Sequence, residues 1–282
     1  MSPTKVWFIT GTSAGLGRAM AEYALSQGDK VVATLRKPEA LADLATKYNS
    51  SHLLVVKLDV TKPQEIIDAF SKAHEVFGRI DVVHNNAGYG SVGEIEGTSD
   101  EIARGIFEVN FWGSTNIARE AVRYFRDVNK PSGGRLLQAS SMVGVQSMPG
   151  IGYYSASKYA LEGISEALSK ELIPAWDVKV TILQLGGFST RSLEPESLIG
   201  TPLHPAYKGG PTESVREYLN SVSVQGDTLK AVREIYKIAS DPTAPLHLSL
   251  GLDAIATVTE KLGTMQEDLE KSAPWSVDLK PK

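Results

Sequence analysis

The chain of 282 residues contains no cysteine, which excludes disulfide bonds, thiol catalysis and cysteine-ligated metal sites. Its five histidines lack the spacing of metal ligands, so we expect no metal centre. An excess of positive charge is lacking as well, because 29 lysines and arginines stand against 33 aspartates and glutamates, for a formal net charge of −4. This balance favours neither a nucleic acid nor an anionic membrane as a partner.

The sequence also has no segment typical of secretion or membrane insertion. Residues 1–15 lack the basic stretch and the following apolar stretch of a secretory signal. Residues 136–157 carry no charge and have about the length of a membrane span, but they are rich in glutamine, serine and glycine. We interpret them as a buried strand that leads into a dry pocket, and we expect a cytoplasmic protein without a membrane partner.

Short apolar runs alternate with longer amphipathic stretches along the first 190 residues. The pattern predicts strands at 5–10, 30–35, 52–58, 80–84, 135–139 and 178–184, and helices at 16–27, 39–48, 63–77, about 99–126 and 152–173. Nearly all-apolar strands separated by helices predict an α/β fold with a doubly wound, Rossmann-type parallel sheet and helices on both faces. No linker rich in proline and glycine divides these residues. We therefore expect a single domain over 1–282, with a last strand and a helix after residue 245 and a loose tail at 274–282.

Ligands of such a sheet bind at the carboxyl ends of its strands, where the first strand is followed by TGTSAGLG, residues 10–17. Glycines let a backbone approach a diphosphate closely, and the helix that follows offers free N–H groups and the positive end of its dipole. A tight turn without a ligand is the alternative. From this turn we assign to cofactor binding Gly11, Ser13, Gly15, Leu16 and Gly17.

The second strand is followed by Arg36 and Lys37, close to where dinucleotide-binding folds commonly carry an acid that holds the ribose 2′-hydroxyl. Leu35 stands near the position of that acid. A carboxylate there would repel a 2′-phosphate, whereas Arg36 can pair with it through two hydrogen bonds. The pattern favours NADP(H) over NAD(H), and a solvated basic pair in a loop is the alternative.

Polar and small residues also follow the third and fourth strands. Asp59, with Val60 beside it, is suited to accept a hydrogen bond from the adenine amino group. Asn110 is a polar residue in the apolar context EVNFWG, and taken alone it indicates a satisfied core amide. The sequence NNAG lets a loop lie against a flat ligand, although asparagine pairs also build ordinary turns. Its last three residues are predicted to bind the cofactor: Asn86, Ala87 and Gly88.

The fifth strand leads to Ser141, and thirteen residues later Tyr154 precedes Lys158 by four positions. Residues four apart lie on one face of a helix, so the phenol and the ammonium are predicted to be neighbours. A phenol ionises near pH 10, and a nearby ammonium favours the phenolate and eases proton exchange. The serine hydroxyl is expected to hold a carbonyl or alcohol oxygen in line. Tyr153 and Tyr159 lie about 140° round the helix from one member of the pair, and we expect them to pack or to line the pocket.

Together these residues resemble the classical short-chain dehydrogenases/reductases. TGTSAGLG, LDV, NNAG, the asparagine of EVN, the serine and YSASK occur in that family's order and spacing over about residues 4–192. The resemblance implies that Tyr154 is the general acid/base, that Lys158 binds the nicotinamide ribose and lowers the pKa of the tyrosine, and that Ser141 orients the substrate.

The resemblance also implies that Asn110 holds a water in the proton relay, that Thr190 contacts the nicotinamide carboxamide, and that a substrate lid spans about 191–225. The loop after the sixth strand reads LGGFST where the family usually has Pro-Gly. The glycine-rich turn lacks a basic residue at Ala14, so the expectation of NADP(H) rests on Arg36.

We therefore predict an NADP-dependent oxidoreductase that transfers a hydride between nicotinamide and a moderately hydrophobic carbonyl or secondary alcohol. The sequence is compatible with a homo-oligomer, a dimer or a tetramer. Two alternatives stay open, a catalytically silent NADP-binding sensor and an epimerase or dehydratase with a tightly held cofactor. The candidates for an apolar pocket are Val143, Met148, Ile151, Tyr153, Phe188, Leu193 and Leu203.

Overall fold

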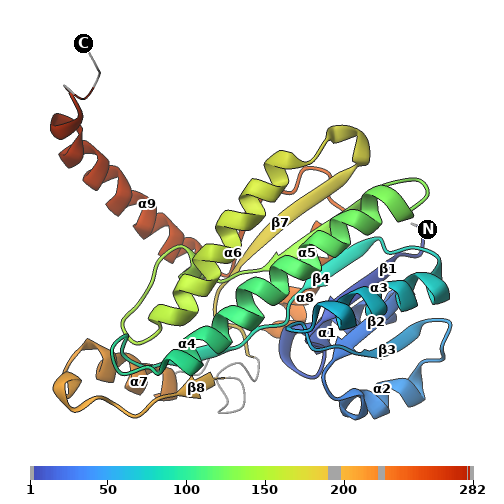
Figure 1. Cartoon of the computed structure of the whole chain (residues 1–282), viewed down its shortest axis with the longest axis horizontal. Helices are drawn as coiled ribbons and strands as arrows, with labels where there is room; N and C mark the ends of the chain where they lie inside the picture. The colour runs from blue at the N-terminus through green and yellow to red at the C-terminus, as the bar shows by residue number, and fades with distance from the viewer. Residues whose placement is uncertain (1–2, 190–197, 222–225, 278, 280–282) are drawn as a thin grey trace.

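A parallel sheet of seven strands forms the centre of the molecule (Figure 1). The structure, a computed structural model, describes residues 3–189, 198–221, 226–277 and 279. The strand order is β3-β2-β1-β4-β6-β7-β9, and all neighbouring strands run parallel. The order reverses beside β1, which confirms the predicted doubly wound fold. The strands are β1 (Val6–Thr10), β2 (Lys30–Leu35), β3 (Leu53–Lys57), β4 (Val82–Asn85), β6 (Gly134–Ala139), β7 (Val178–Leu185) and β9 (His247–Leu250).

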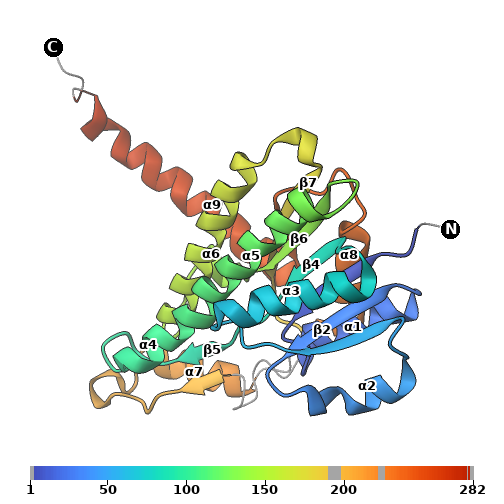
Figure 2. The same cartoon turned by 45° about the vertical axis from the view of Figure 1, so that its right-hand side comes forward.

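Helices cover both faces of this sheet, as predicted (Figures 1 and 2). Side chains of one strand alternate between two cores. In β1, Phe8 stacks on Phe70 of α3 with 4.1 Å between ring centroids, whereas Trp7 and Ile9 pack on the side of α1 and α8. The helices are α1 (Gly15–Ser26), α2 (Ala42–Lys47), α3 (Pro63–Phe77), α4 (Asp100–Phe107), α5 (Ser114–Arg123), α6 (Gly152–Glu171), α7 (Pro211–Ser221), α8 (Thr228–Ile238) and α9 (Leu252–Ser272).

The helix predicted at about 99–126 is present but irregular. It begins after Ser99, whose side chain accepts a hydrogen bond from the backbone N–H of Ile102, and it continues to Val128. Two segments are π-helical, Glu108–Gly113 between α4 and α5 and Tyr124–Val128 after α5. A π-helical turn holds an extra residue and widens the helix locally. The sequence pattern did not predict these segments, and the first of them contains Asn110.

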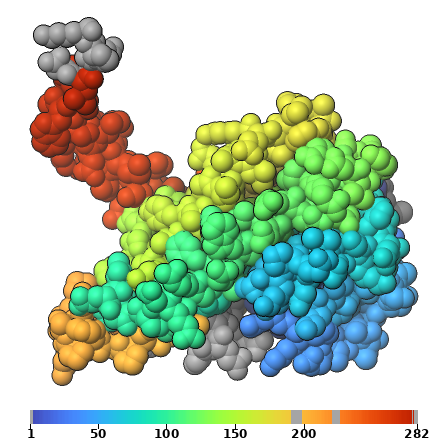
Figure 3. All heavy atoms as spheres, viewed as in Figure 1, coloured from blue at the N-terminus to red at the C-terminus, as the bar shows by residue number. Residues whose placement is uncertain are grey.

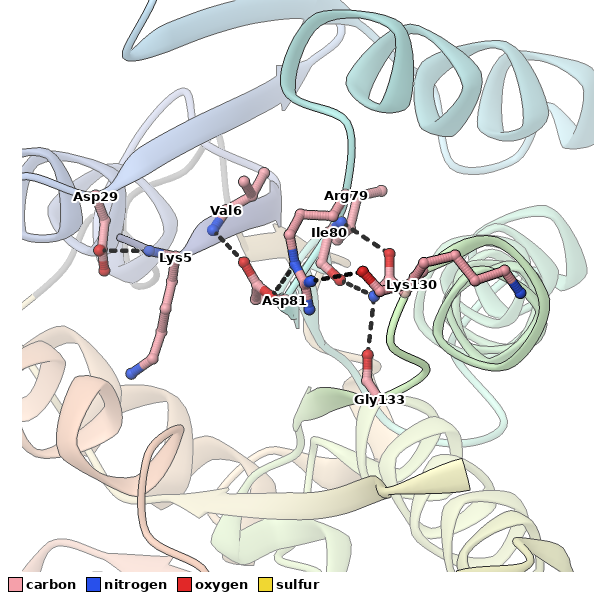
Figure 4. Close-up of polar contacts among 9 residues, drawn as sticks. Lys5, Val6, Asp29, Arg79, Ile80, Asp81, Lys130 and Gly133 are labelled. Atoms are coloured by element: carbon pink, nitrogen blue, oxygen red, sulfur yellow. Dashed lines mark hydrogen bonds and ion pairs between the residues drawn. The ribbon is translucent and has the colours of Figure 1, made fainter. Parts of the chain in front are cut away.

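Acidic side chains fasten the amino-terminal end of the sheet (Figure 4). Asp29 accepts a hydrogen bond from the backbone N–H of Lys5 at 2.9 Å. Asp81 accepts one from the N–H of Val6 at 2.8 Å and one from Nε of Arg79 at 2.6 Å. The start of β1 is therefore tied to the segments before β2 and β4.

A buried amide completes this end of the sheet. Asn129 accepts a hydrogen bond from the N–H of Ile80 at 3.2 Å. Its Nδ2 donates to the carbonyl oxygens of Ile80 at 2.6 Å and of Gly133 at 2.8 Å. One fully buried side chain thus satisfies three backbone groups in the segments that lead into β4 and β6.

A second, two-stranded parallel sheet pairs β5 (Gly90–Val92) with β8 (Leu198–Gly200), which sequence reasoning did not predict. Buried Glu94 ties this part to α7, because its Oε2 lies 3.4 Å from Nη2 of Arg216. Arg216 also donates to the carbonyl oxygen of Thr201 at 2.7 Å. The strand β8 and α7 fall within the predicted lid at 191–225, whereas residues 190–197 and 222–225 lie outside the described residues.

The last strand and helix follow residue 245, as predicted, and α9 projects from the rest of the molecule (Figures 1 and 2). At its root, Asp253 accepts a hydrogen bond from the N–H of Gly187 in the loop after β7. The segment Ala273–Ser276 forms one 3₁₀ turn, and the loose tail at 274–282 stays a prediction. Within the described ranges, no helix has the length and apolar character needed to cross a membrane.

Candidate active site

The glycine-rich turn after β1 is packed against the loop after β4. Gly11 has a φ of +72°, and a Cβ on it would lie 2.9 Å from Cα of Ala87. A Cβ on Gly17 would lie 2.4 Å from the carbonyl oxygen of Gly11 and 2.5 Å from Nδ2 of Asn86. Real Cβ atoms do not approach that closely, so both glycines are required by the packing of the turn itself.

The first turn of α1 has no side-chain cap from its N-cap residue. The helix begins at Gly15, which has a φ of +58°. The preceding Ala14 has no side chain that caps the helix, and the first turn contains no acidic residue. The N–H groups and the positive end of the helix dipole therefore point at the strand ends, as a phosphate site requires. Ser13 and Leu16 flank this start, so the turn unites the five residues predicted there.

The loop after β4 is held by its asparagines. Thr10 accepts hydrogen bonds from the N–H groups of Asn86 and Ala87, both at 2.9 Å, and Asn86 Nδ2 donates to the carbonyl oxygen of Thr10 at 3.0 Å. Asn85 is buried and donates to Oε1 of Gln138 at 2.6 Å. Both amides thus fix the loop to its neighbouring strands.

Gly88 links this loop to the predicted catalytic residues. A Cβ on Gly88 would lie 3.0 Å from Oδ1 of Asn110 and 3.5 Å from Nζ of Lys158. The glycine-rich turn, the NNAG loop and the lysine therefore follow one another along the carboxyl end of the sheet. This is the path that an extended dinucleotide would take.

The second and third strands end in a charged pair of loops. Arg36 is exposed after β2, and among the described residues its guanidinium makes no ion pair within 4 Å. Burial favours a raised pKa for the Asp59 carboxyl, but hydrogen bonds from Thr61 and the charge of Arg36 lower it overall. Leu35 is buried in the core, so its side chain does not stand at a ribose site. Val60 is buried against Gly113 of the π-helical segment.

Tyr154 and Lys158 share one face of α6, as their spacing predicts. The Lys158 Nζ lies 5.9 Å from the centroid of the Tyr154 ring and donates a hydrogen bond to the carbonyl oxygen of Ala139 at 2.7 Å. Ala139 is the last residue of β6, so this bond holds the ammonium between the helix and the sheet. Lys158 is buried, whereas Tyr154 is only half-buried.

Burial dominates the protonation of both groups. It lowers the pKa of Lys158 to about 8, although the charge of Glu162 acts in the opposite direction. It also raises the pKa of Tyr154, and a hydrogen bond with Ser141 only partly offsets this. Burial penalises the phenolate, so the pKa of Tyr154 lies above its usual value here, and the lowering effect implied for Lys158 stays a prediction. A protonated Tyr154 at neutral pH suits a proton donor.

Ser141 and Asn110 reach the site from the other two sides. Ser141 starts a short helical turn and donates to the carbonyl oxygen of Leu185 at 3.3 Å. The amide of fully buried Asn110 accepts from the N–H of Tyr89 at 3.1 Å and donates to the carbonyl oxygen of Tyr89 at 2.9 Å and to Oγ of Ser157 at 3.1 Å. The side chain therefore positions the NNAG loop against α6, as a satisfied core amide does.

Glu162 is a functional candidate that sequence reasoning missed. It is buried, accepts a hydrogen bond from Oγ of Ser140 at 2.6 Å, and accepts another from Nε2 of Gln184 at 2.9 Å. Burial raises its pKa, against the effect of these bonds and of the Lys158 charge. The signal was present, since Glu162 follows Lys158 by four positions, the spacing that joins Tyr154 to Lys158.

The other two tyrosines of the motif lie elsewhere. Tyr153 borders a surface hollow of about 330 Å³ beside α4, and its hydroxyl donates to the carbonyl oxygen of Ile95 at 3.5 Å. Tyr159 donates to the carbonyl oxygen of Val145 and borders a groove between α6 and α9. Neither belongs with Tyr154 and Lys158, as their positions on the helix indicated.

An apolar cluster surrounds Tyr154. Three predicted pocket residues belong to it, Val143, Met148 and Ile151. Phe188 packs instead with the core on the α1 side of the sheet. Leu193 and Thr190 lie outside the described residues, and Leu203 is half-buried in the loop after β8. Sequence reasoning did not identify three further members from β5, β8 and α7: Val92, Leu198 and Leu219.

Comparisons with known proteins agree with this geometry. The family model described as short chain dehydrogenase matches residues 5–197. An uncharacterized oxidoreductase of Schizosaccharomyces pombe is 37% identical over 273 residues, which are 96% of this chain and 90% of the relative. The NADPH-dependent 1-acyldihydroxyacetone phosphate reductase of Saccharomyces cerevisiae is 29% identical over 78% of this chain and 71% of its own. A crystal structure of a short-chain dehydrogenase from Streptomyces avermitilis superposes with a TM-score of 0.89 at 33% identity and covers 98% of each chain.

Proposed function

The chain belongs to the short-chain dehydrogenase/reductase family of oxidoreductases, and from that premise we propose that it is an NADP-dependent enzyme of carbonyl reduction or alcohol oxidation. The proposed substrate is a moderately hydrophobic small-molecule ketone, aldehyde or secondary alcohol. The single domain over 1–282, the substrate lid at about 191–225 and the cytoplasmic location stay predictions.

One observation carries this proposal: cationic side chains and N–H donors without a protein partner line the carboxyl end of the sheet in the described structure. The first turn of α1 is uncapped, and Arg36 has no ion pair within 4 Å among the described residues. Lys158 carries three donors, and within the described residues one of them is bonded, to the carbonyl oxygen of Ala139. These groups lie in the order in which a dinucleotide presents its 2′-phosphate, its diphosphate and its nicotinamide ribose. The residues present therefore fit an NADP cofactor.

A bound nicotinamide cofactor supplies or accepts the hydride. The protein has to hold the carbonyl oxygen and to exchange its proton. The Ser141 hydroxyl is close enough to lower the pKa of Tyr154 against the effect of burial, and both hydroxyls are proposed to hold one oxygen atom. In reduction, Tyr154 donates its proton to that oxygen, and it takes the proton back in oxidation. Lys158 then holds the ribose and stabilises the phenolate that forms during turnover.

The remaining predicted residues take supporting roles in this proposal. Asp59 accepts from the adenine amino group, with Val60, Ala87 and Gly88 forming the surface beneath the nucleotide. Asn110 keeps Gly88 and Lys158 in place and is proposed to hold the relay water near its backbone. Thr190 is proposed to contact the carboxamide.

Arg36 supports NADP(H) over NAD(H). The Saccharomyces cerevisiae relative is named as an NADPH-dependent reductase, which supports the same cofactor. The exposed guanidinium is suited to pair with a 2′-phosphate. The end of β2 reads Leu35-Arg36-Lys37, so none of these three residues offers a carboxylate to the ribose hydroxyls. Leu35 is also buried.

The test is turnover with a panel of aliphatic, aromatic and cyclic ketones and aldehydes, followed as NADPH oxidation by purified protein. We expect steady turnover with at least one class and more than tenfold less with NADH. Protein that binds NADPH but turns over no carbonyl or alcohol would indicate a silent sensor. Protein that retains its nicotinamide through purification and consumes none would indicate an epimerase or dehydratase.

A further inference from the structure

The helix α9 leaves the body of the protein with an apolar side uncovered. Its first turns contact β9 and the turn after β6, where Ala254 is buried, but most of its length projects as an arm (Figure 3). Large apolar side chains on this arm are exposed, Leu262 by 61% and Leu269 by 64%. An apolar stripe facing water along several turns is costly for a lone helix.

The stripe has the spacing of a coiled-coil seam. Ile255, Leu262 and Leu269 recur every seven residues, and Val258 and Met265 fall three positions after the first two of them. These are the a and d positions of a heptad repeat. The helix has 21 residues and is therefore about 30 Å long, so the seam spans nearly all of it. A second helix fits this seam.

The charges beside the seam identify the second helix and its direction. Lys261 and Asp268 occupy the g positions, and among the described residues neither makes an ion pair within 4 Å. In an antiparallel pair of identical helices, g positions face g positions. Pairing Leu262 with Met265 of a second copy brings Lys261 opposite Asp268 of that copy, twice by symmetry. In a parallel pair, Lys261 would face the uncharged Gln266 instead.

Other occupants fit the arm less well. Its outward positions include Glu260, Glu267 and Glu270, which oppose docking on an anionic membrane. A groove of about 400 Å³ separates α9 from α6 beside Lys261 and Met265, so α6 does not cover this part of the seam. Two-fold pairing uses the same surface on both copies, the commonest form of homodimer.

We propose that α9 is an assembly arm that pairs antiparallel with α9 of a second copy of this chain. Each arm then lies along the root of the other, with Ile255 level with Ser272 of the second copy. This inference does not depend on the proposed chemistry.

The first experiment measures molar mass against concentration for the full chain by sedimentation and by light scattering. Leu262→Glu is expected to halve the mass of the wild-type assembly at equal concentration and to weaken association at least a hundredfold. The matched control, Thr264→Glu, places the same charge on the outer side of the helix and should leave the mass unchanged. A wild type that is monomeric up to 100 times the concentration used in the activity assay, or a Leu262→Glu variant with the wild-type mass, overturns the proposal.

Charge reversal tests the direction. Lys261→Asp and Asp268→Lys should each weaken association about tenfold, and the combined Lys261→Asp/Asp268→Lys chain should restore it. If the single variants weaken association and the double variant does not restore it, the antiparallel register is overturned. Circular dichroism of each variant distinguishes lost pairing from a lost helix. Where a variant has lost the helix, the cross-linking test below decides instead.

The absence of cysteine permits a clean cross-linking test that keeps the seam intact. Thr259→Cys and Gln266→Cys proteins, mixed and treated with a short bismaleimide, should give a covalent heterodimer, because these positions face each other in the antiparallel pair. Each variant alone should cross-link at least tenfold less. Equal cross-linking in the mixture and in Thr259→Cys alone overturns the register, and so does no cross-linking at all.

Discussion

Polar side chains at the two ends of the central sheet differ in whether they bond to the protein itself. At the amino-terminal end, Asp29, Asp81 and Asn129 bond to backbone groups that the strands leave unpaired. At the carboxyl end, Lys158 has one bonded donor, α1 has no cap and Arg36 has no ion pair among the described residues. At the amino-terminal end the named side chains bond to the protein itself, whereas at the carboxyl end donors and charges stay available for a ligand.

This difference indicates where stability and activity are located. Saturated hydrogen bonds at one end hold the strands in place, so substitutions there should lower the free energy of unfolding. Donors without a partner at the other end add little to the stability of the fold, so substitutions that remove them should lower turnover and leave the fold intact.

The sharpest test at the carboxyl end is Tyr154→Phe. We expect the rate of carbonyl reduction to fall roughly 10²–10⁴-fold, because only the proton-donating hydroxyl is lost. The affinity for NADPH and the free energy of unfolding should stay near their wild-type values. The measurement is kcat with the best substrate of the panel, together with urea unfolding.

Tyr153→Phe and Tyr159→Phe are the controls for this change, since their hydroxyls contact backbone carbonyls away from Lys158. Both should keep most of the activity. Equal losses in Tyr153→Phe and Tyr154→Phe would contradict the assignment of the helix face.

The counterpart at the amino-terminal end is Asn129→Ala. It leaves the N–H of Ile80 and two carbonyl oxygens buried without their partner, and we expect the free energy of unfolding to drop by about 3 kcal/mol. The kcat of the folded fraction should change less than twofold. Lys130→Ala, at the exposed neighbouring residue, should cost little. A selective loss of kcat in Asn129→Ala would show that the two ends are not independent.

Between the two ends, β4 contains a buried histidine that responds to acid. Both ring nitrogens of His84 lack a hydrogen-bond partner within the described ranges, and burial lowers its pKa to about 4. The unfolded chain binds this proton near pH 6.5, so between pH 6.5 and 4 the unfolded state binds more protons and stability falls as the pH falls. From pH 7 to pH 5 the loss amounts to about 2 kcal/mol.

His84→Leu should remove this part of the acid sensitivity, measured as unfolding free energy at the two pH values. His52→Ala, at an exposed position, is the control and should keep the wild-type slope. An unchanged pH dependence in His84→Leu would mean that the imidazole is protonated or solvated in the folded protein.

A smaller effect, on cofactor affinity, is expected for Arg36→Ala at the carboxyl end of the sheet. A charge-assisted pair contributes about 1.5–3 kcal/mol, and an exposed one lies at the lower end, so the Kd for NADPH should rise roughly tenfold. The Kd for NADH should hardly change. Lys37→Ala, one position further along the loop, is the matched control. Equal losses for both cofactors would assign the arginine to loop structure, and a wild-type preference for NADH would contradict the NADP proposal.

The smallest expected effect belongs to Glu162→Gln. The carboxylate favours the charged form of Lys158, so its removal should lower the pKa of Lys158 further below about 8. The alkaline limb of the kcat/KM profile should then shift to lower pH by less than one unit. Glu166→Gln, one turn further along α6 and paired with Lys170, is the control. A profile identical to wild type would limit Glu162 to holding Ser140.

The regular part of the molecule was predictable because apolar periodicity reports directly on burial. The helix Pro63–Phe77 has the predicted bounds, and the Tyr154–Lys158 pair follows from helical geometry alone. The strand predicted at 80–84 lies at Val82–Asn85, because Asp81 is used to fasten β1 instead of continuing the apolar run.

The parts that were not predictable depend on contacts between distant segments. Pairing of β5 with β8 joins residues more than 100 positions apart. The pKa of Tyr154 depends on burial as well as on nearby charges, and spacing along the helix does not report burial. The burial of Leu35 likewise results from packing against α1 and α2.

The π-helical segment Glu108–Gly113 implies that the long helix carries a residue more than a regular α-helix would need there. Such a segment is what a single-residue insertion leaves behind. Removing one residue would regularise the hydrogen bonds but turn every side chain on one side of the cut by about 100° relative to the other. Asn110 would then no longer face Tyr89 and Ser157. The extra residue is therefore what turns Asn110 toward these two partners, and a regular helix would lose both contacts.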